Sequence, residues 1–257
     1  MSAGAGERAQ MSDTRRAAVW GLVAAHAAAR DRRVSVADVC AVAVPSVQVN
    51  GAWVIAGSGR GPAFVMGVSD LAGEQLAELQ LTLGEGPCHD VLAAGAPVLA
   101  SDLDDDHFGR RWPAFAAEAC RLGAAAVFAF PLTIGVIQAG VMGLYRVSPG
   151  PLASRQLGDC LLLADIATAL LLAGTDGTAD GDGTRLDGQA PDLAAHRAEV
   201  DQATGMLTVQ LGVTAAEAFA RLQAYAYAQD RRLADVAGDI VARRLRLRPD
   251  PPRGGKQ

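Results

Sequence analysis

The sequence predicts an α/β domain, in which helices flank an antiparallel sheet, followed by a small all-α domain of three helices. Three observations predict this arrangement. The chain has 257 residues, which is longer than a typical single domain. Residues 173–191 are rich in Gly, Asp and Thr and almost free of large apolar side chains, so we expect a flexible acidic linker over residues 174–191. Strand and helix patterns alternate before this segment, whereas only helical patterns follow it.

The N-terminal domain is expected over residues 15–173, behind a disordered segment over residues 1–14. Apolar residues at helical spacing predict helices over residues 15–30, 35–44, 71–79, 90–94, 112–122 and 152–172. The second of these helices should stop at Pro45. Short apolar runs between turn residues predict strands over residues 52–56, 63–68, 97–101, 125–132 and 139–146. The last two strands form a hairpin, and hairpins predict an antiparallel sheet.

One uncharged stretch, residues 122–145, is long enough to cross a membrane by residue count. Pro131, Gly135 and Gly140 interrupt it, so a buried hairpin fits this stretch better than a transmembrane helix. Residues 1–13 are small and polar and lack the apolar core of a signal peptide. We therefore expect a cytoplasmic protein with no membrane partner.

No catalytic arrangement of side chains is recognisable in the sequence. The four cysteines lie far apart and form no Cys-x-x-Cys pair, which favours separate reduced thiols over a zinc site. Cys88 followed by His89 could mark a bilin attachment point, but the turn before it differs in sequence from that site, so a small Cys packed at a helix start is favoured. The acidic run over residues 102–107 lacks the Gly and terminal Glu of a calcium loop. We expect no enzyme, no metal and no cofactor.

The C-terminal domain is expected over residues 192–247, ahead of a disordered tail over residues 248–257. Its first helix, over residues 193–211, carries an apolar stripe and ends at Gly212. Thr214 and Glu217 form a capping box that starts the second helix. The third helix repeats the apolar spacing from residue 233 onward. Three helices of this size make a small bundle with a thin core.

Charge is unevenly distributed between the two parts of the chain. From residue 192 onward there are ten Arg or Lys against eight Asp or Glu, a net charge of +2, whereas residues 1–191 carry a net charge of −7. The whole chain carries −5, which implies no general attraction to nucleic acid or to an anionic membrane. The small C-terminal part of the chain, from residue 192 onward, is therefore better suited to bind an anion than the rest.

Four segments of the N-terminal domain carry a resemblance. They are Leu-Gly-Glu-Gly-Pro-Cys-His-Asp-Val-Leu at residues 83–92, Pro-Val-Leu-Ala-Ser-Asp at 97–102, Val-Phe-Ala-Phe-Pro-Leu at 127–132 and Gly-Val-Met-Gly-Leu-Tyr at 140–145. This part of the chain resembles the GAF family of bacterial sensor domains. The resemblance implies a six-stranded antiparallel sheet between helices, a pocket for a small molecule on one face, and a homodimer formed through the first and last helices. The signal, a small molecule or a protein, stays unknown because a fold does not fix a ligand.

Three segments of the C-terminal domain carry a more specific resemblance. They are Asp-Gln-Ala-Thr-Gly-Met-Leu at residues 201–207, Leu-Gly-Val-Thr-Ala-Ala-Glu-Ala-Phe at 211–219 and Leu-Ala-Asp-Val-Ala at 233–237. They are similar to the ANTAR family of RNA-binding transcription antiterminators. The resemblance implies recognition of a pair of stem-loops in nascent leader RNA, which prevents the terminator hairpin from forming. Thr204 stands where the family usually has lysine, and this departure removes a cation that would pair with phosphate.

The ANTAR resemblance and the exposed arginines together predict an RNA-binding face. We expect RNA to contact Ala203, Thr204, Gly205, Arg221, Tyr225, Arg231, Arg232, Arg243 and Arg244. The arginines could instead keep a small domain soluble, and Gly205 could serve close helix packing. Tyr225 and Tyr227 point to different sides of one helix, so at most one is in the core and the other is a platform for base stacking.

Two other interpretations of the chain stay open. In the first, the three-helix domain mediates dimerisation or docking of a partner and never binds RNA. In the second, the protein is a photosensor or redox sensor that holds a bilin or a metal, which visible absorbance of the purified protein would reveal.

Overall fold

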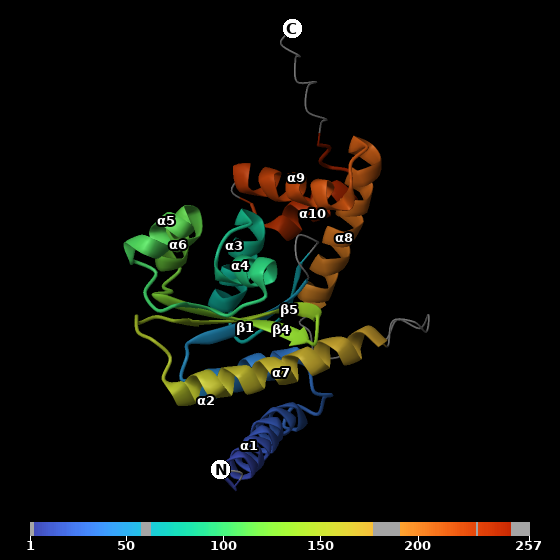
Figure 1. The fold of residues 1–257 in the computed structure, drawn as a ribbon. Helices are drawn as coiled ribbons and strands as arrows, with labels where there is room; N and C mark the ends of the chain where they lie inside the picture. The colour runs from blue at the N-terminus through green and yellow to red at the C-terminus, as the bar shows by residue number, and fades with distance from the viewer. Residues whose placement is uncertain (1–2, 58–62, 177–190, 230, 248–257) are drawn as a thin grey trace.

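Five strands form one antiparallel sheet in the N-terminal domain, in the order β2-β1-β5-β4-β3 (Figure 1). The computed structural model describes residues 3–57, 63–176, 191–229 and 231–247. The strands are β1 Gly51–Ala56, β2 Phe64–Val68, β3 Val98–Ala100, β4 Ala126–Ile134 and β5 Ile137–Arg146. These are the strands that the sequence predicts, with small shifts at their ends. The sixth strand implied by the GAF resemblance is wrong for the described residues, because the chain leaves β3 through turns that lead into a helix.

β4 and β5 form the long hairpin of the sheet. Their register pairs Phe128 with Leu144 and Phe130 with Met142, and all four side chains are fully buried. The residues between them along each strand point to the other face of the sheet, which is buried as well. Because both faces of this strand pair are covered, its residues are apolar throughout. This explains why its composition resembles that of a membrane-spanning segment. The prediction that residues 122–145 form a buried hairpin is confirmed.

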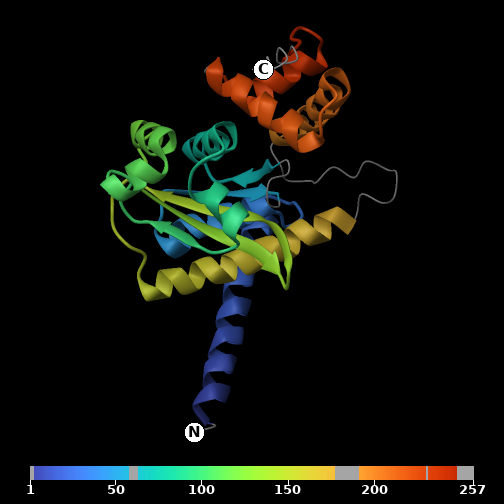
Figure 2. The same ribbon diagram turned by 45° about the horizontal axis from the view of Figure 1, so that its top comes forward.

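Three helices lie on one side of the sheet: α1 Ala3–Ala28, α2 Val36–Val47 and α7 Ser154–Asp176. α7 packs against α2, β4 and β5, and α1 projects from this layer (Figure 2). By length and composition alone, residues Ser154–Ala173 of α7 could cross a membrane. In the structure this stretch contributes Cys160, Leu163 and Ala167 to the protein core, which accounts for its apolar composition.

Four shorter helices lie on the opposite side: α3 Leu71–Leu83, α4 Pro87–Ala94, α5 Asp106–Arg111 and α6 Pro113–Arg121. α3 ends at Gly84, with φ 64°, and Gly86 precedes α4 with φ 119°. Both angles lie in the region that favours glycine, and Pro87 suits the first position of a helix. The Gly-Glu-Gly-Pro motif therefore reverses the chain between α3 and α4 within a few residues.

Several helix boundaries differ from the sequence prediction. α1 begins at Ala3, whereas the sequence predicts a disordered segment over residues 1–14. α2 continues through Pro45 to Val47, since a proline in the last turn removes only one hydrogen bond near the helix end. α7 extends to Asp176. The rest of the predicted linker, residues 177–190, and the predicted tail, residues 248–257, lie outside the described residues.

The C-terminal domain consists of three helices, as predicted: α8 Pro191–Leu211, α9 Ala215–Ala228 and α10 Leu233–Val241. Gly212, with φ 65°, ends α8. The Thr214 hydroxyl accepts a hydrogen bond from the Glu217 amide at 3.3 Å, and the Glu217 carboxylate accepts one from the Thr214 amide at 3.0 Å. Hydrogen bonds from Thr214 lower the pKa of Glu217. The predicted capping box is confirmed.

The C-terminal domain packs on the α3 side of the sheet (Figures 1 and 2). α9 and α10 contact α3, and α8 contacts β2 directly. Buried side chains of both domains form one continuous cluster, in which Leu81 of α3 and Phe219 of α9 are members. The two domains therefore share a hydrophobic core.

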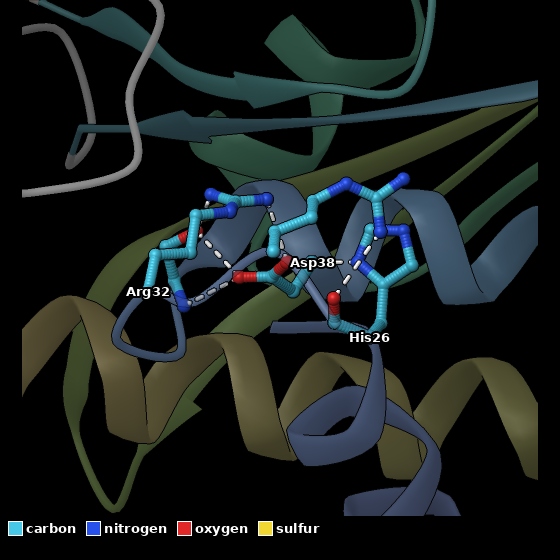
Figure 3. Close-up of polar contacts among 5 residues, drawn as sticks. His26, Arg32 and Asp38 are labelled. Atoms are coloured by element: carbon cyan, nitrogen blue, oxygen red, sulfur yellow. Dashed lines mark hydrogen bonds and ion pairs between the residues drawn. The ribbon is translucent and has the colours of Figure 1, made fainter. Parts of the chain in front are cut away.

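Asp38, in the first turn of α2, is a fully buried carboxylate that joins three segments (Figure 3). Its Oδ1 accepts a hydrogen bond from Arg32 Nη2 at 2.7 Å and lies 2.8 Å from Nδ1 of His26 in α1. Its Oδ2 accepts hydrogen bonds from the Ser35 amide at 2.9 Å and the Ser35 hydroxyl at 2.8 Å. Burial alone raises the pKa of Asp38, but the hydrogen bonds and the Arg32 charge outweigh burial and lower it below 3.8. This network fixes the end of α1 against the start of α2.

We expect Asp38→Asn to lower the free energy of unfolding at pH 7 by about 2–4 kcal/mol, because it leaves Arg32 without its buried counter-ion. Since the folded pKa of Asp38 is lowered, its stabilisation is complete above the unfolded value near 3.8 and is lost as pH falls through the folded pKa. Urea unfolding of both chains at pH 7 and pH 3 measures this difference.

The matched control for Asp38 is Asp165→Asn. Asp165 pairs with Arg16 at 3.6 Å between two exposed side chains, so its loss should change stability by less than about 0.5 kcal/mol. Equal losses in the two variants would contradict the structural role of Asp38.

Candidate nucleic-acid interface

The predicted Ala-x-Gly turn of α8 presents one exposed residue and two buried ones. Ala203 is fully buried and Thr204 is 4% exposed, and the Thr204 hydroxyl donates to the Val200 carbonyl at 2.7 Å. Gly205 is exposed, and a Cβ at this position would meet no atom within 4 Å beyond its own helical turns. Close helix packing therefore does not require Gly205. Of these three predicted RNA contacts, the structure presents only Gly205 to solvent.

Two arginines bind one carboxylate of α10, and a third exposed arginine follows the same helix. Arg231 Nη2 donates to Asp239 Oδ2 at 2.7 Å, and Arg244 Nε donates to Asp239 Oδ1 at 2.7 Å. These hydrogen bonds lower the pKa of Asp239. Arg243 follows α10 with φ 59°, and its side chain is exposed. We call Arg231, Arg243 and Arg244 the α10 arginine group. Asp239 pairs with Arg231 and Arg244, and Asp235 lies on the same helix.

The other two predicted arginines lie elsewhere. Arg232, at the N-cap of α10, turns toward the N-terminal domain, where its Nη2 donates to Glu74 Oε1 at 2.9 Å. Arg221 is half-buried on α9, and its charge contributes to the lowered pKa of Glu217, after the hydrogen bonds from Thr214. The five predicted arginines therefore do not form one patch in this arrangement of the domains.

The two tyrosines of α9 divide between core and surface, as the sequence indicates. Tyr225 is partly buried and packs against the core cluster, whereas Tyr227 is 59% exposed. The exposed ring suited to stacking on a base is therefore Tyr227. The choice of Tyr225 as an RNA contact is not supported by its position.

A cavity of about 340 Å³ lies between the two domains. The N-terminal domain lines it with Gln80 and Cys88 among others, and α9 lines it with Phe219, Ala220 and Gln223. It lies on the side of the sheet that carries α3 and α4. The N-terminal domain alone therefore does not complete this cavity, because one wall belongs to α9.

The Cys88 thiol at this cavity is fully buried. It accepts a hydrogen bond from Trp53 Nε1 at 3.3 Å, while the Cys88 amide donates to Gln80 Oε1 at 2.7 Å. Burial raises the pKa of Cys88 to about 12, so the thiol is protonated at neutral pH. This geometry favours a packed cysteine over a reactive attachment point.

The acidic run over residues 102–107 caps its own backbone. Asp102 Oδ1 accepts a hydrogen bond from the Asp104 amide at 3.1 Å, and Asp105 Oδ1 accepts one from the His107 amide at 2.7 Å at the start of α5. Within the described residues, no group of three His, Cys, Asp or Glu is arranged to hold a metal ion. The carboxylates of this run therefore accept hydrogen bonds from backbone amides, Asp102 in the turn before α5 and Asp105 at the N-cap of α5.

Sequence reasoning missed the contacts that α9 and α10 make with the N-terminal domain. Their partners Glu74, Glu78 and Leu81 lie far away in the sequence, on α3. The only available signal was a second stripe on α9, with Ala216, Ala220 and Gln223 at helical spacing beside the core stripe.

Comparisons with known proteins agree with the division of the chain into an N-terminal α/β domain and a C-terminal helical domain. Residues 189–241 match the family model of the ANTAR domain. No curated protein matches the chain. Among solved structures, the GAF domain of a phosphoenolpyruvate-protein phosphotransferase from Acinetobacter is 12% identical, with 65% of this chain and 97% of that chain covered and a TM-score of 0.46.

Two further structures are similar to the N-terminal part. The GAF domain of a phosphoenolpyruvate-protein phosphotransferase from Coxiella burnetii is 14% identical, covers 63% of this chain and 96% of its own, and has a TM-score of 0.48. A GAF domain from Synechocystis, in its photoproduct state, is 14% identical, covers 55% and 93%, and has a TM-score of 0.44. The chain therefore contains an ANTAR domain at residues 189–241, and its N-terminal domain is similar to GAF domains.

Proposed function

We propose that this protein is an RNA-binding regulator of transcription antitermination. The observation that carries the proposal is the ANTAR match at residues 189–241, since ANTAR domains are RNA-binding antitermination modules. In the proposal, the GAF-like domain receives a small-molecule or protein signal and controls the ANTAR domain. The ANTAR domain binds tandem stem-loops in leader RNA and keeps the terminator hairpin from forming. The protein acts in the cytoplasm as a homodimer, and its role is regulatory rather than catalytic.

The α10 arginine group supplies the chemistry that RNA binding needs. A guanidinium pairs with phosphate through two parallel hydrogen bonds and stacks on unpaired bases of a loop. Asp239 holds Arg231 and Arg244 by short hydrogen bonds, so less side-chain freedom is lost when RNA binds. Gly205 adds an exposed position at which a backbone or a base can come close to α8.

A second function is supported by the contacts between the domains. α9 and α10 pack against α3, and Arg232 pairs with Glu74, which is the behaviour expected of a module that binds protein. In this alternative, the three-helix domain serves docking or dimerisation and does not bind RNA. Substitutions of Arg243 and Arg244 distinguish the two functions better than substitutions of Arg231 and Arg232, because Arg232 also contacts the N-terminal domain.

Charge reversal of Arg243 and Arg244 tests the RNA-binding function. We expect Arg243→Glu with Arg244→Glu to weaken binding of tandem stem-loop RNA on the order of 100-fold at 0.1 M salt, because two phosphate contacts are lost and two charges are inverted. The slope of log affinity against log salt concentration should also become shallower by about 1 to 2. Binding titrations over a salt series measure both quantities.

The matched control is Arg110→Glu, an exposed arginine of the N-terminal domain that pairs only weakly with Asp106. It changes the net charge in the same direction but should leave RNA affinity within about twofold. Crosslinking to cellular RNA identifies natural targets. If the wild-type chain binds no member of a genomic pool of tandem stem-loops, the RNA-binding function is wrong and the docking alternative stands.

The variant Gly205→Ala tests whether RNA contacts α8 at this position, because its expected effects on helix stability and on RNA affinity have opposite signs. A methyl group at this position meets open space, so the change should raise helix stability by up to about 1 kcal/mol. If RNA approaches the α8 backbone here, the same methyl group should weaken RNA binding. Thermal unfolding and RNA titration of the variant measure the two effects. A higher melting temperature with unchanged RNA affinity would remove Gly205 from the RNA face.

A further inference from the structure

An ion pair joins the predicted RNA face to the sensor-like domain. Arg232 Nη2 lies 2.9 Å from Glu74 Oε1 of α3, with the Glu74 side chain 21% exposed. Arg232 is the N-cap residue of α10, so its guanidinium reaches α3 from the start of that helix. The Nη2 hydrogen that Arg232 donates to Glu74 is not available to a phosphate at the same time. Docking on α3 therefore competes with phosphate for Arg232.

A second carboxylate lies one turn further along α3. Glu78 is buried, and its Oε2 has no hydrogen-bond partner within the described residues. It borders a cavity of about 390 Å³ that α3 and α6 share with Tyr227, Arg231 and Arg232 of the ANTAR domain. A buried carboxylate without a partner is costly, and separating the domains would return Glu78 to water.

α9 completes the contact between the domains. Gln223 Nε2 donates to the backbone carbonyl of Leu81 at the end of α3. Ala216 and Ala220, on the same stripe of α9, line the cavity beside Gln80 and Leu81. Exposed Tyr227 borders the second cavity. The stripe of α9 that carries Tyr227, the ring best placed for stacking, thus faces the N-terminal domain.

We propose that α3 is an autoinhibitory surface, on which Glu74 takes the place of an RNA phosphate at Arg232 and holds the ANTAR domain in a docked arrangement that binds RNA weakly. This inference rests on the proposed function. Docking occupies Arg232, binds Gln223 of α9 to the end of α3 and places two carboxylates beside the cavity that Tyr227, Arg231 and Arg232 line. RNA and α3 therefore compete, and the apparent RNA affinity of the full chain is reduced in proportion to the fraction of undocked molecules.

Glu78 gives the docked arrangement a pH dependence. Burial raises the pKa of Glu78 to about 7, against the opposing charge of Arg232, and Glu74 and Asp235 add to the rise. Glu118 of α6 and Arg231 also line the cavity beside it. In separated domains the carboxyl regains an ordinary pKa near 4.5. The docked state thus binds the extra proton, so docking strengthens, and RNA binding weakens, as pH falls through 7.

Substitutions of Glu74 in the full chain test the inference. At pH 8, Glu74→Gln should bind tandem stem-loop RNA about threefold more tightly than wild type, and Glu74→Arg about tenfold, because the ion pair is first lost and then replaced by repulsion. The control Asp106→Asn removes a carboxylate that is 93% exposed and far along the sequence, and it should change affinity by less than about twofold. The probe is a pool of tandem stem-loop RNAs with randomised loops.

Two further readouts report docking itself. Amide hydrogen exchange over residues 71–83 and 215–228 should rise in Glu74→Arg without RNA, as it should in the wild type when RNA is added. Glu78→Gln should abolish the decrease in RNA affinity between pH 8 and pH 6 that the wild type shows. Glu74→Gln keeps the side-chain volume, so its result stands even if Glu74→Arg folds poorly.

The outcomes separate the inference from the proposed function. If all chains bind RNA with equal affinity, or if exchange over α3 does not change in Glu74→Arg, autoinhibition by α3 is wrong and RNA binding stands. If neither the wild type nor any variant binds the RNA pool, the proposed function fails and the inference fails with it. Tighter binding by both Glu74 variants, with the control unchanged, supports both.

Discussion

The apolar cluster on the α3 side of the sheet belongs to both domains, and the position of the ANTAR domain depends on it. The opposite face is covered by α2 and α7 of the N-terminal domain itself. On the α3 side, α8 touches β2 directly, so the C-terminal domain covers surface that would otherwise be exposed. Burial of apolar surface favours association of the two domains, but it is non-directional and does not fix how the C-terminal domain is oriented on the N-terminal domain. The orientation comes from polar contacts, namely Arg232 with Glu74 and Gln223 with the Leu81 carbonyl.

The same helices therefore serve two purposes with different surfaces. The core stripe of α9 holds the three-helix domain together, while the neighbouring stripe faces α3. Arg243 and Arg244 follow the end of α10, whereas Arg231 lines the same cavity as Arg232. Residues 192–247 carry seven arginines and seven acidic residues, so apolar packing rather than net charge holds the two domains together. The contacts between the domains are thus mainly apolar, with one ion pair and one side-chain hydrogen bond to a backbone carbonyl beside them.

The local elements could be predicted from the sequence because their causes are local. The capping box at Thr214, the five strand segments and the hairpin over residues 122–145 follow from turn chemistry and apolar periodicity. The extension of α2 past Pro45 was not predicted, because a proline in the last turn removes only one hydrogen bond near the helix end and does not stop the helix there. The candidate site was predicted by resemblance and only in part. Ala203 and Thr204 proved buried, and Tyr227 rather than Tyr225 is exposed, because the resemblance assigns contacts to helix positions without showing which of them pack in the core. Glu74 and Glu78 carry no motif, and only the docked structure pairs Glu74 with Arg232 and places Glu78 near that charge.

The cavity between Cys88 and Gln223 has walls from two domains, and this has a thermodynamic consequence. A molecule that fills it touches atoms of both domains, so its affinity differs between the docked and separated arrangements. In the proposed autoinhibition RNA favours separation, so by linkage RNA must change the affinity of that molecule by the same factor as the molecule changes the affinity for RNA. Binding of the signal molecule and binding of RNA would then be one coupled equilibrium. The concentration of RNA in the cell would change the affinity of the protein for the signal molecule, just as the signal molecule would change its affinity for RNA.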